Sequence, residues 1–215
     1  GCNQKNDEVP LLIYDINDPY MYQFNEDILD QELKGFSFKD YDAENSQIIQ
    51  NEQIENLLNE NPKLMVINPV DRQSVYTMIE KSDKQEIPII FFNREPLRVD
   101  MLSSDRVYYI GAPAENSAII QSELVIDIFG NPTMLSEHDR NDDNIIQIII
   151  LKGEQGHQDA EIRTETVIEE LEAYGYELEI LTIKVCDWNQ AKAKEAMFDL
   201  IDVYGDQFEI IISNN

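Results

Sequence analysis

The sequence predicts an α/β protein with two doubly wound parallel-sheet (Rossmann-like) lobes joined by a hinge, the second lobe incomplete. Short apolar segments alternate with amphipathic helical segments along the 215 residues, a pattern typical of βαβ units and parallel sheets. A Gly111-Ala112-Pro113 cluster interrupts the alternation, which then begins again. A chain of this length can bury two cores of roughly 100 residues each.

The first lobe is expected over residues 9–111, after a disordered polar tether at residues 1–8. Short aliphatic and aromatic runs predict strands at residues 10–14, 36–39, 64–67, 88–92 and 107–110. Apolar residues at helical spacing predict helices between them, at residues 20–33, 46–59 and 72–82.

The second lobe is expected over residues 112–215. The same patterns predict helices at residues 115–128, 159–174 and 189–204, with strands at residues 145–151, 176–183 and 208–212. No closing helix follows the last strand, so either the protein continues or another chain completes this lobe.

Charge and hydropathy exclude two classes of partner. Sixteen basic against 43 acidic side chains give a formal net charge of −27, and such a field repels nucleic-acid phosphates and anionic lipid. No apolar run approaches the ~20 residues that cross a bilayer. Neutral solutes and cations remain as ligands.

The two cysteines are too few for a disulfide framework and lack metal-ligand spacing. Cys2 follows Gly1 and precedes a polar segment, as at the mature end of a bacterial lipoprotein, where a lipid on Cys2 would anchor the protein to the outer face of the cell membrane. The alternative is a chain end that carries a cysteine by chance. Cys186 is expected to be a half-buried structural thiol.

Polar and aromatic residues gather where the predicted strands end, which is where ligands bind in doubly wound sheets. They are Tyr14, Asp18, Tyr20, Asn93, Arg94, His157, Asp159, Arg163, Trp188 and Asn215. Such polar groups can hydrogen bond to sugar hydroxyls, and aromatic rings can cover the apolar faces of a sugar ring. Most also have a structural alternative: Asp18 as a helix cap, Asp159 with Arg163 as a solvated ion pair, Tyr20 and Trp188 as core residues, His157 as a loop residue, and Asn93 with Arg94 as a strand-end turn.

Six stretches, in order along nearly the whole chain, resemble the bacterial periplasmic galactose/glucose-binding proteins, a family of type I sugar-binding proteins. They are NPVD at residues 68–71, IPIIFFNREP at 87–96, YYIG at 108–111, LKGEQGHQDAEIR at 151–163, WNQAKAK at 188–194 and SNN at 213–215.

The resemblance implies a role for each strand-end residue. Asp159 and Arg163 would bond the anomeric hydroxyl and the ring oxygen, and Asp18 would accept a hydrogen bond from the hydroxyl at carbon 4. Tyr20 and Trp188 would sandwich the sugar ring. The remaining contacts would come from Tyr14, Asn93, His157, Asn215 and Arg94, the last standing where the best-known members have lysine.

An acidic loop predicts a structural Ca²⁺ site. Asp139, Asn141, Asp143 and Gln147 offer side-chain oxygens at loop positions 1, 3, 5 and 9, and Ile145 offers a backbone carbonyl at position 7. Asn144 takes the turn position, where glycine is usual. The resemblance implies that Glu209 supplies the distant bidentate carboxylate. The alternative is an acidic surface loop.

These features favour an extracytoplasmic lipoprotein that binds D-glucose or D-galactose between two lobes, for transport through a membrane permease (ABC transport) or for sensing through a histidine kinase or chemoreceptor. An enzyme is not expected, because Arg163 would keep Asp159 ionised rather than proton-donating and no phosphate-loop, nucleophile-elbow or zinc motif is present.

Overall fold

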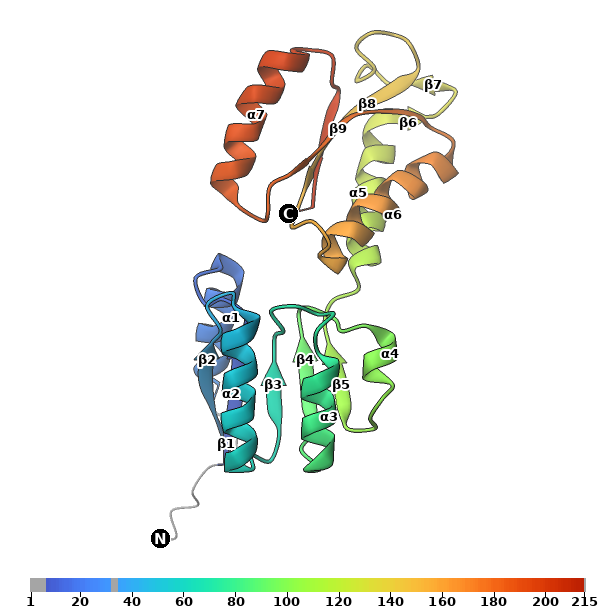
Figure 1. Ribbon diagram of the computed structural model, residues 1–215. Coiled ribbons are helices and arrows are strands. Elements are labelled where there is room, and N and C mark those ends of the chain that lie inside the picture. Colours follow the sequence, from blue (N-terminus) through green and yellow to red (C-terminus); the bar gives the residue numbers. More distant parts are fainter. Residues whose placement is uncertain (1–6, 32–34, 215) are drawn as a thin grey trace. The chain divides into compact units, whose positions relative to one another are not determined.

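The computed structural model describes residues 7–31 and 35–214 of the chain, which divides into two compact units, Gly1–Ala112 and Pro113–Asn215 (Figure 1). Cys2 and Asn215 therefore lie outside the described residues. Within those ranges, none of the helices combines the length and the apolar character needed to cross a membrane.

The first unit is a five-stranded parallel sheet with helices on both faces. Its strands are β1 (Asp7–Ile13), β2 (Phe36–Asp42), β3 (Met65–Ile67), β4 (Ile89–Phe92) and β5 (Val107–Ile110), and its helices are α1 (Pro19–Leu29), α2 (Gln47–Glu60), α3 (Tyr76–Lys84) and α4 (Arg98–Met101). The strand order is β2-β1-β3-β4-β5, and every pairing is parallel. The predicted doubly wound sheet is thus confirmed.

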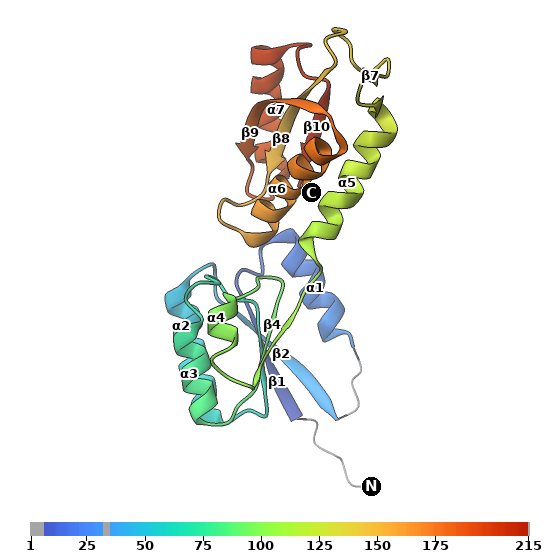
Figure 2. The same ribbon diagram turned by 90° about the vertical axis from the view of Figure 1, so that its right-hand side faces the viewer.

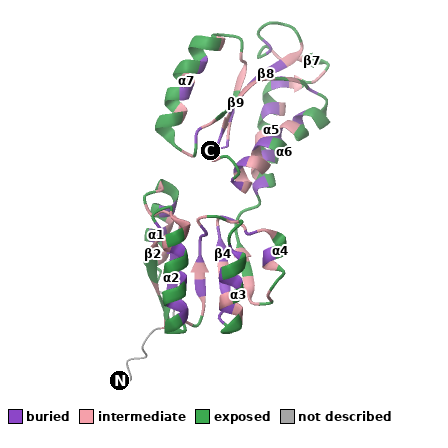
Figure 3. Cartoon of the chain, viewed as in Figure 1, coloured by how far each residue is buried: buried purple, intermediate pink, exposed green. Residues whose placement is uncertain are grey.

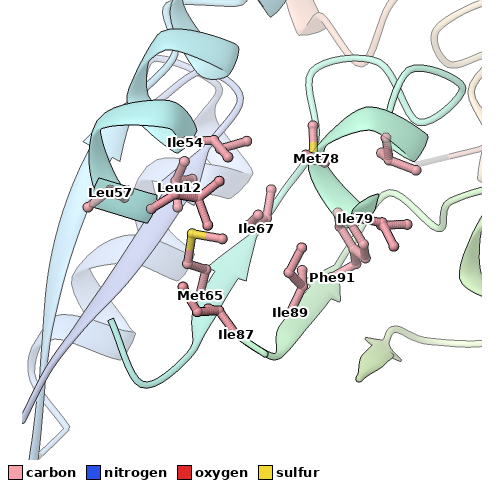
Figure 4. Close-up of a cluster of buried hydrophobic side chains, with 12 residues drawn as sticks. Leu12, Ile54, Leu57, Met65, Ile67, Met78, Ile79, Ile87, Ile89 and Phe91 are labelled. Atoms are coloured by element: carbon pink, nitrogen blue, oxygen red, sulfur yellow. The ribbon is translucent and has the colours of Figure 1, made fainter. Parts of the chain in front are cut away.

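Each face of this sheet has its own core, because successive side chains of a strand point to opposite faces. Leu12 and Phe91 pack with α2 and α3 on one face (Figure 4). Leu11 and Ile13 pack with Met21 of α1 on the other. Figure 2 shows α1 and the α2–α3 pair on opposite sides of the sheet.

Helix α3 begins at Tyr76 rather than at the predicted residue 72, and side-chain chemistry explains the delay. The Asp71 carboxylate accepts hydrogen bonds from the backbone N–H of Gln73 and from the hydroxyl of Ser74. Such an Asx turn competes with helix formation. The short helix α4 was also not predicted.

The second unit contains a three-stranded parallel sheet and a small hairpin. Its elements are α5 (Ala114–Phe129), β6 (Gly130–Asn131), β7 (Met134–Leu135), β8 (Ile145–Lys152), α6 (Gln158–Tyr174), β9 (Glu177–Val185), α7 (Gln190–Tyr204) and β10 (Ile210–Ser213). The order of the parallel strands is β10-β8-β9, and the antiparallel hairpin β6–β7 was not predicted. The central strand β8 is almost continuously buried, as its largely aliphatic sequence, interrupted only by Gln147 before Lys152 ends it, predicts.

The core of the second unit lies between this sheet and helices α5 and α6. Ile148 and Ile150 of β8 pack with Phe129 of α5 and with Val167 and Leu171 of α6. Figure 3 shows in both units that the buried residues gather along the central strands and the helix faces that cover them.

Both sheets reverse their strand order beside their first strand. The chain proceeds outward from β1 to β2 on one side and through β3 on the other, and it proceeds from β8 to β9 on one side and to β10 on the other. Ligands of doubly wound sheets bind at such switch points, outside the carboxyl ends of the strands. The residues after β1, β3, β8 and β10 therefore stand where this kind of sheet binds ligands.

Replacing Phe91 with alanine tests the first core, because this ring is fully buried between β4 and helices α2 and α3. We expect the substitution to lower the free energy of unfolding of the first unit by about 3–5 kcal/mol, through lost transfer energy and a residual cavity. Urea denaturation followed by circular dichroism measures the change. The control is Phe36→Ala on the edge strand β2, whose ring is 40% exposed; equal losses in the two variants would contradict the assigned core.

Candidate functional site

Tyr14, Asp18 and Arg94 form a connected group at the switch point of the first sheet. The Tyr14 hydroxyl donates a 2.7 Å hydrogen bond to Oδ2 of Asp18. The guanidinium carbon of Arg94 lies 3.9 Å from the centre of the Tyr14 ring, in a cation–π contact. Arg94 is only 6% exposed, and its Nη1 donates to the carbonyl oxygen of Val70 at 2.6 Å. The Tyr14 ring thus contacts a cation over its face and an anion through its hydroxyl group.

Asp18 also caps helix α1, as its structural alternative predicted. Its Oδ1 accepts from the backbone N–H groups of Tyr20 and Met21, each at 2.9 Å. These bonds use the lone pairs of Oδ1, whereas Oδ2 receives only the Tyr14 hydroxyl among the bonds described. One lone pair of Oδ2 is therefore available to accept a ligand hydroxyl.

The ring of Tyr20 is exposed rather than part of the core. It is 64% exposed, and its centre lies 6.4 Å from that of Phe24, which in turn stacks on Phe92 at 4.8 Å. An exposed aromatic ring beside a polar strand end can cover the apolar face of a ligand.

Asn93 follows β4 in a left-handed backbone conformation, with φ of 60°. Asparagine tolerates this region better than most residues do. The Tyr109 hydroxyl donates to the Asn93 carbonyl oxygen at 3.2 Å, which helps to hold the turn. The first unit therefore brings Tyr14, Asp18, Asn93 and Arg94 to one edge of its sheet.

In the second unit, His157 begins helix α6 as its N-cap. The backbone N–H of Asp159 donates to Nδ1 of His157 at 3.2 Å. A neutral imidazole whose Nδ1 accepts a hydrogen bond carries its proton on Nε2. Asp159 lies in the first turn of the same helix, where the helix dipole stabilises a negative charge.

Arg163 lies one turn further along α6, and its Nη1 donates to the backbone carbonyl oxygen of Asn214. This bond ties the guanidinium to the end of β10. His157, Asp159 and Arg163 thus come together on the first turns of a single helix at the switch point of the second sheet.

Trp188 rests on the backbone of Gly153. A methyl group at Gly153 would come within 2.3 Å of the indole ring, so only glycine allows this contact. The indole also meets the His157 ring edge to face, with the centres 5.5 Å apart. The ring borders a cavity of about 330 Å³ that is also lined by Cys186, whose thiol is buried rather than half-buried. Trp188 is therefore neither a core residue nor a free surface ring.

A charged pair braces the loop between β8 and α6. Lys152 is 7% exposed, and its Nζ lies 2.6 Å from Oε2 of Glu161. Oε1 of Glu161 accepts from the backbone N–H of Gly156 at 2.8 Å. Burial alone would raise the pKa of Glu161, but the Lys152 ammonium and the Gly156 N–H together lower it below its usual value. The sequence reasoning did not identify this pair.

The acidic loop, for which a Ca²⁺ site was predicted, brings several of the predicted ligands together through hydrogen bonds. Asn141 and Gln147 both donate side-chain N–H groups to Oδ2 of Asp143, at 2.8 and 2.9 Å. The backbone N–H of Arg140 donates to Oε1 of Glu209 at 2.5 Å, so the distant glutamate does reach the loop. Ile145, whose backbone carbonyl was the predicted ligand at position 7, is the first residue of strand β8, directly after the loop.

Three oxygens, two on this loop and one on Glu209, have the chemistry that a cation requires. Oδ1 of Asp139, Oε1 of Gln147 and Oε2 of Glu209 are buried without a hydrogen-bond partner, and such orphaned acceptors are costly. Burial raises the pKa of Glu209, and the charges of Asp139 and Asp143 raise it further. Among the described residues, however, no three His, Cys, Asp or Glu side chains already form a metal-holding cluster. The donor set suits Ca²⁺, which accepts mixed oxygen ligands from carboxylate, amide and backbone groups.

Replacing Gly153 with alanine tests the seat of the indole ring. Because the added methyl group would overlap the ring, we expect Trp188 to be displaced towards water. Trp188 is the single tryptophan of the chain, so its emission should shift to longer wavelength and become more sensitive to acrylamide. The matched control is Gln190→Ala, which alters an exposed neighbour on α7. An unchanged spectrum in Gly153→Ala would contradict the described contact.

Comparison with known proteins identifies the family. A family model described as a periplasmic binding protein domain matches residues 9–215. The D-galactose/methyl-galactoside binding periplasmic protein MglB of Haemophilus influenzae is 36% identical over 219 residues, which cover 98% of this chain and 63% of MglB. This chain therefore spans less than two thirds of that relative's length.

Solved structures share the fold. The Caulobacter myo-inositol binding protein bound to myo-inositol has a TM-score of 0.79 at 15% identity, over 97% of this chain and 66% of that one. The fructose-binding periplasmic domain of a hybrid two-component system has a TM-score of 0.73 at 16% identity, over 96% of this chain and 62% of that one. The resemblance that the six motifs indicated is confirmed, and this chain belongs to the periplasmic binding protein family.

Proposed function

We propose that the protein is an extracytoplasmic solute-binding protein that binds a monosaccharide, D-glucose or D-galactose, with residues at the switch points of both units. The observation that carries this proposal is the constellation on the β8–α6 loop. There His157, Asp159 and Arg163 stand at one helix start beside the indole of Trp188. The similarity to MglB, which is described as binding D-galactose and methyl-galactoside, supports the same class of ligand.

The chemistry of these groups suits a neutral polyol ring. Asp159 accepts hydrogen bonds, Arg163 and His157 donate them, and Trp188 offers an apolar face. A sugar presents hydroxyls of both kinds together with apolar C–H faces. The first unit offers a second set of the same composition, with Asp18 as acceptor, Arg94 as a cation and Tyr20 as an exposed ring.

We propose transport as the primary output, with delivery of the sugar to a membrane permease after the two units close on it. Sensing is the second candidate, in which the liganded protein regulates a membrane histidine kinase or a chemoreceptor. The structural similarity to a fructose-binding domain of a two-component system favours keeping this alternative. In either case we expect binding without chemical conversion of the sugar.

The proposal has two further features, a Ca²⁺ site and a lipid anchor. The loop from Asp139 to Gln147 together with Glu209 would hold a structural Ca²⁺, which would replace the missing partners of the orphaned oxygens. A lipid on Cys2 would anchor the protein outside the cell. Because Cys2 lies outside the described residues, the anchor stays a prediction.

Sugar binding is tested by isothermal titration of the chain with D-glucose, D-galactose, D-xylose and D-ribose. We expect binding of at least one hexose, and we expect Asp159→Asn to weaken it by about 100-fold, because hydrogen bonds to a charged group contribute roughly 1.5–3 kcal/mol each. The matched control is Asp202→Asn, at an exposed position on α7. A chain that binds none of these sugars would contradict the proposal.

Calcium binding is tested by thermal unfolding of the chain in a chelator and in excess Ca²⁺. An ion that binds only the folded state stabilises it, by about 4 kcal/mol at a concentration 1,000 times its Kd. We therefore expect Ca²⁺ to raise the Tm of the wild type and to have a much smaller effect on Glu209→Gln. The control Glu195→Gln changes an exposed glutamate of α7 and should retain the full response. The same Tm with and without Ca²⁺ in the wild type would refute the site.

A further inference from the structure

We infer that Asn68 is a positioning residue that holds the side chain of Asn93 with its NH₂ group towards the ligand, so that Asn93 acts as a hydrogen-bond donor. The inference deepens the proposed function and rests on it, because it assigns a chemical role at the same sugar site. Asn68 follows β3 and precedes Pro69 at the switch point of the first sheet.

Asn68 is fully buried, and hydrogen bonds engage both its backbone and its side chain. Its backbone N–H donates to the carbonyl oxygen of Leu12 at 2.8 Å, and its carbonyl oxygen accepts from Nε2 of Gln50 at 2.9 Å. Gln50 is itself fully buried and accepts from the backbone N–H of Val70 at 2.9 Å. The backbone of Asn68 is thus held at both its N–H and its carbonyl oxygen, independently of any contact of its side chain.

The amide of Asn68 fits its surroundings in one orientation only. Its Oδ1 accepts from the backbone N–H of Tyr14 at 3.3 Å, and its Nδ2 donates to the backbone carbonyl oxygen of Phe92 at 3.3 Å. A backbone N–H can only donate and a carbonyl can only accept. Reversing the amide would oppose donor to donor and acceptor to acceptor.

This orientation decides that of Asn93. Nδ2 of Asn68 also donates to Oδ1 of Asn93 at 3.2 Å, and because that nitrogen cannot accept a hydrogen bond, Asn93 must turn its oxygen towards it. The NH₂ group of Asn93 then points away from Asn68. The backbone of Asn93 is held independently, since the Tyr109 hydroxyl donates to its carbonyl oxygen at 3.2 Å. The side chain therefore has a defined direction and a defined polarity.

A ligand oxygen that meets Asn93 must consequently accept a hydrogen bond. The same edge of the sheet presents the opposite polarity at Asp18, whose Oδ2 can only accept when it is ionised. A sugar bound at this end of the sheet would thus meet a fixed donor, the NH₂ group of Asn93, and a fixed acceptor, Oδ2 of Asp18. Preorganised groups of this kind lower the ordering cost of binding.

The test is a double-mutant cycle between Asn68→Asp and Asn93→Gly, measured as the Kd for whichever hexose the wild-type chain binds. Asn68→Asp keeps the acceptor for Tyr14 but replaces the donor that faces Asn93, and glycine retains the left-handed backbone at Asn93. We expect Asn68→Asp to weaken binding by about tenfold, the equivalent of one hydrogen bond. In the Asn93→Gly background the same change should weaken binding by less than about twofold, because the residue through which it acts is gone.

Two outcomes overturn the inference: an undiminished effect of Asn68→Asp in the Asn93→Gly background, or wild-type affinity in Asn68→Asp itself. Asn59→Asp is the matched control at an exposed position of α2 and should bind as the wild type does. Asn68→Ala serves in the same cycle if the buried charge of Asn68→Asp prevents folding. A wild-type chain that binds no sugar would instead refute the proposed function.

A measurement on the wild type does not depend on the stability of any Asn68 variant. The NH₂ signals of Asn93 in a ¹⁵N-correlated NMR spectrum are identified by their loss in Asn93→Gly. We expect them to shift when sugar is added, because the group meets the ligand directly. Signals that stay unchanged at saturating sugar would refute the donor role of Asn93.

Discussion

Where a parallel strand leaves its sheet, the next backbone N–H groups lose their ladder partners, and a buried strand end needs another acceptor. A buried asparagine supplies it in each unit. Oδ1 of Asn68 accepts from the backbone N–H of Tyr14, and Oδ1 of Asn214 accepts from that of Gly153 at 2.9 Å. Both asparagines also donate their own backbone N–H to the first strand of their sheet. The two units thus satisfy the strand ends at their switch points with the same pattern of hydrogen bonds. Loops that carry candidate ligand groups begin at these strand ends.

The charged groups of the candidate site are held in place by interactions with other parts of the protein. Arg94 is anchored by the Val70 carbonyl and the Tyr14 ring, Asp18 by the start of α1, and the β8–α6 loop by the pair of Lys152 and Glu161. Charges fixed in this way do not have to be ordered when a ligand arrives. The arrangement therefore favours recognition by geometry over adaptation of flexible side chains.

The sequence predicted the strands and helices well where burial is periodic, because that periodicity is the physical cause of the fold. It missed the late start of α3, since an Asx turn at Asp71 depends on side-chain hydrogen bonds that no hydropathy pattern contains. The positions of the candidate residues within the described chain were predictable because strand ends are. Their hydrogen-bonding roles were not: the polarity of Asn93 follows from Asn68 on a different strand, and the seat of Trp188 follows from the absence of a side chain at Gly153. Asn68 begins the NPVD stretch of the resemblance, but no sequence pattern indicated which hydrogen bonds its side chain makes.

Each unit satisfies the strand ends at its switch point with its own residues, which has a consequence for folding. The two cores of the first unit draw only on residues of that unit, from Leu11 to Tyr109, and Asn68 completes its hydrogen bonds within the same segment. The described core of the first unit is therefore complete without residues of the second. Since domains generally fold as units, the first sheet can form whether or not the residues of β8 have found their own places.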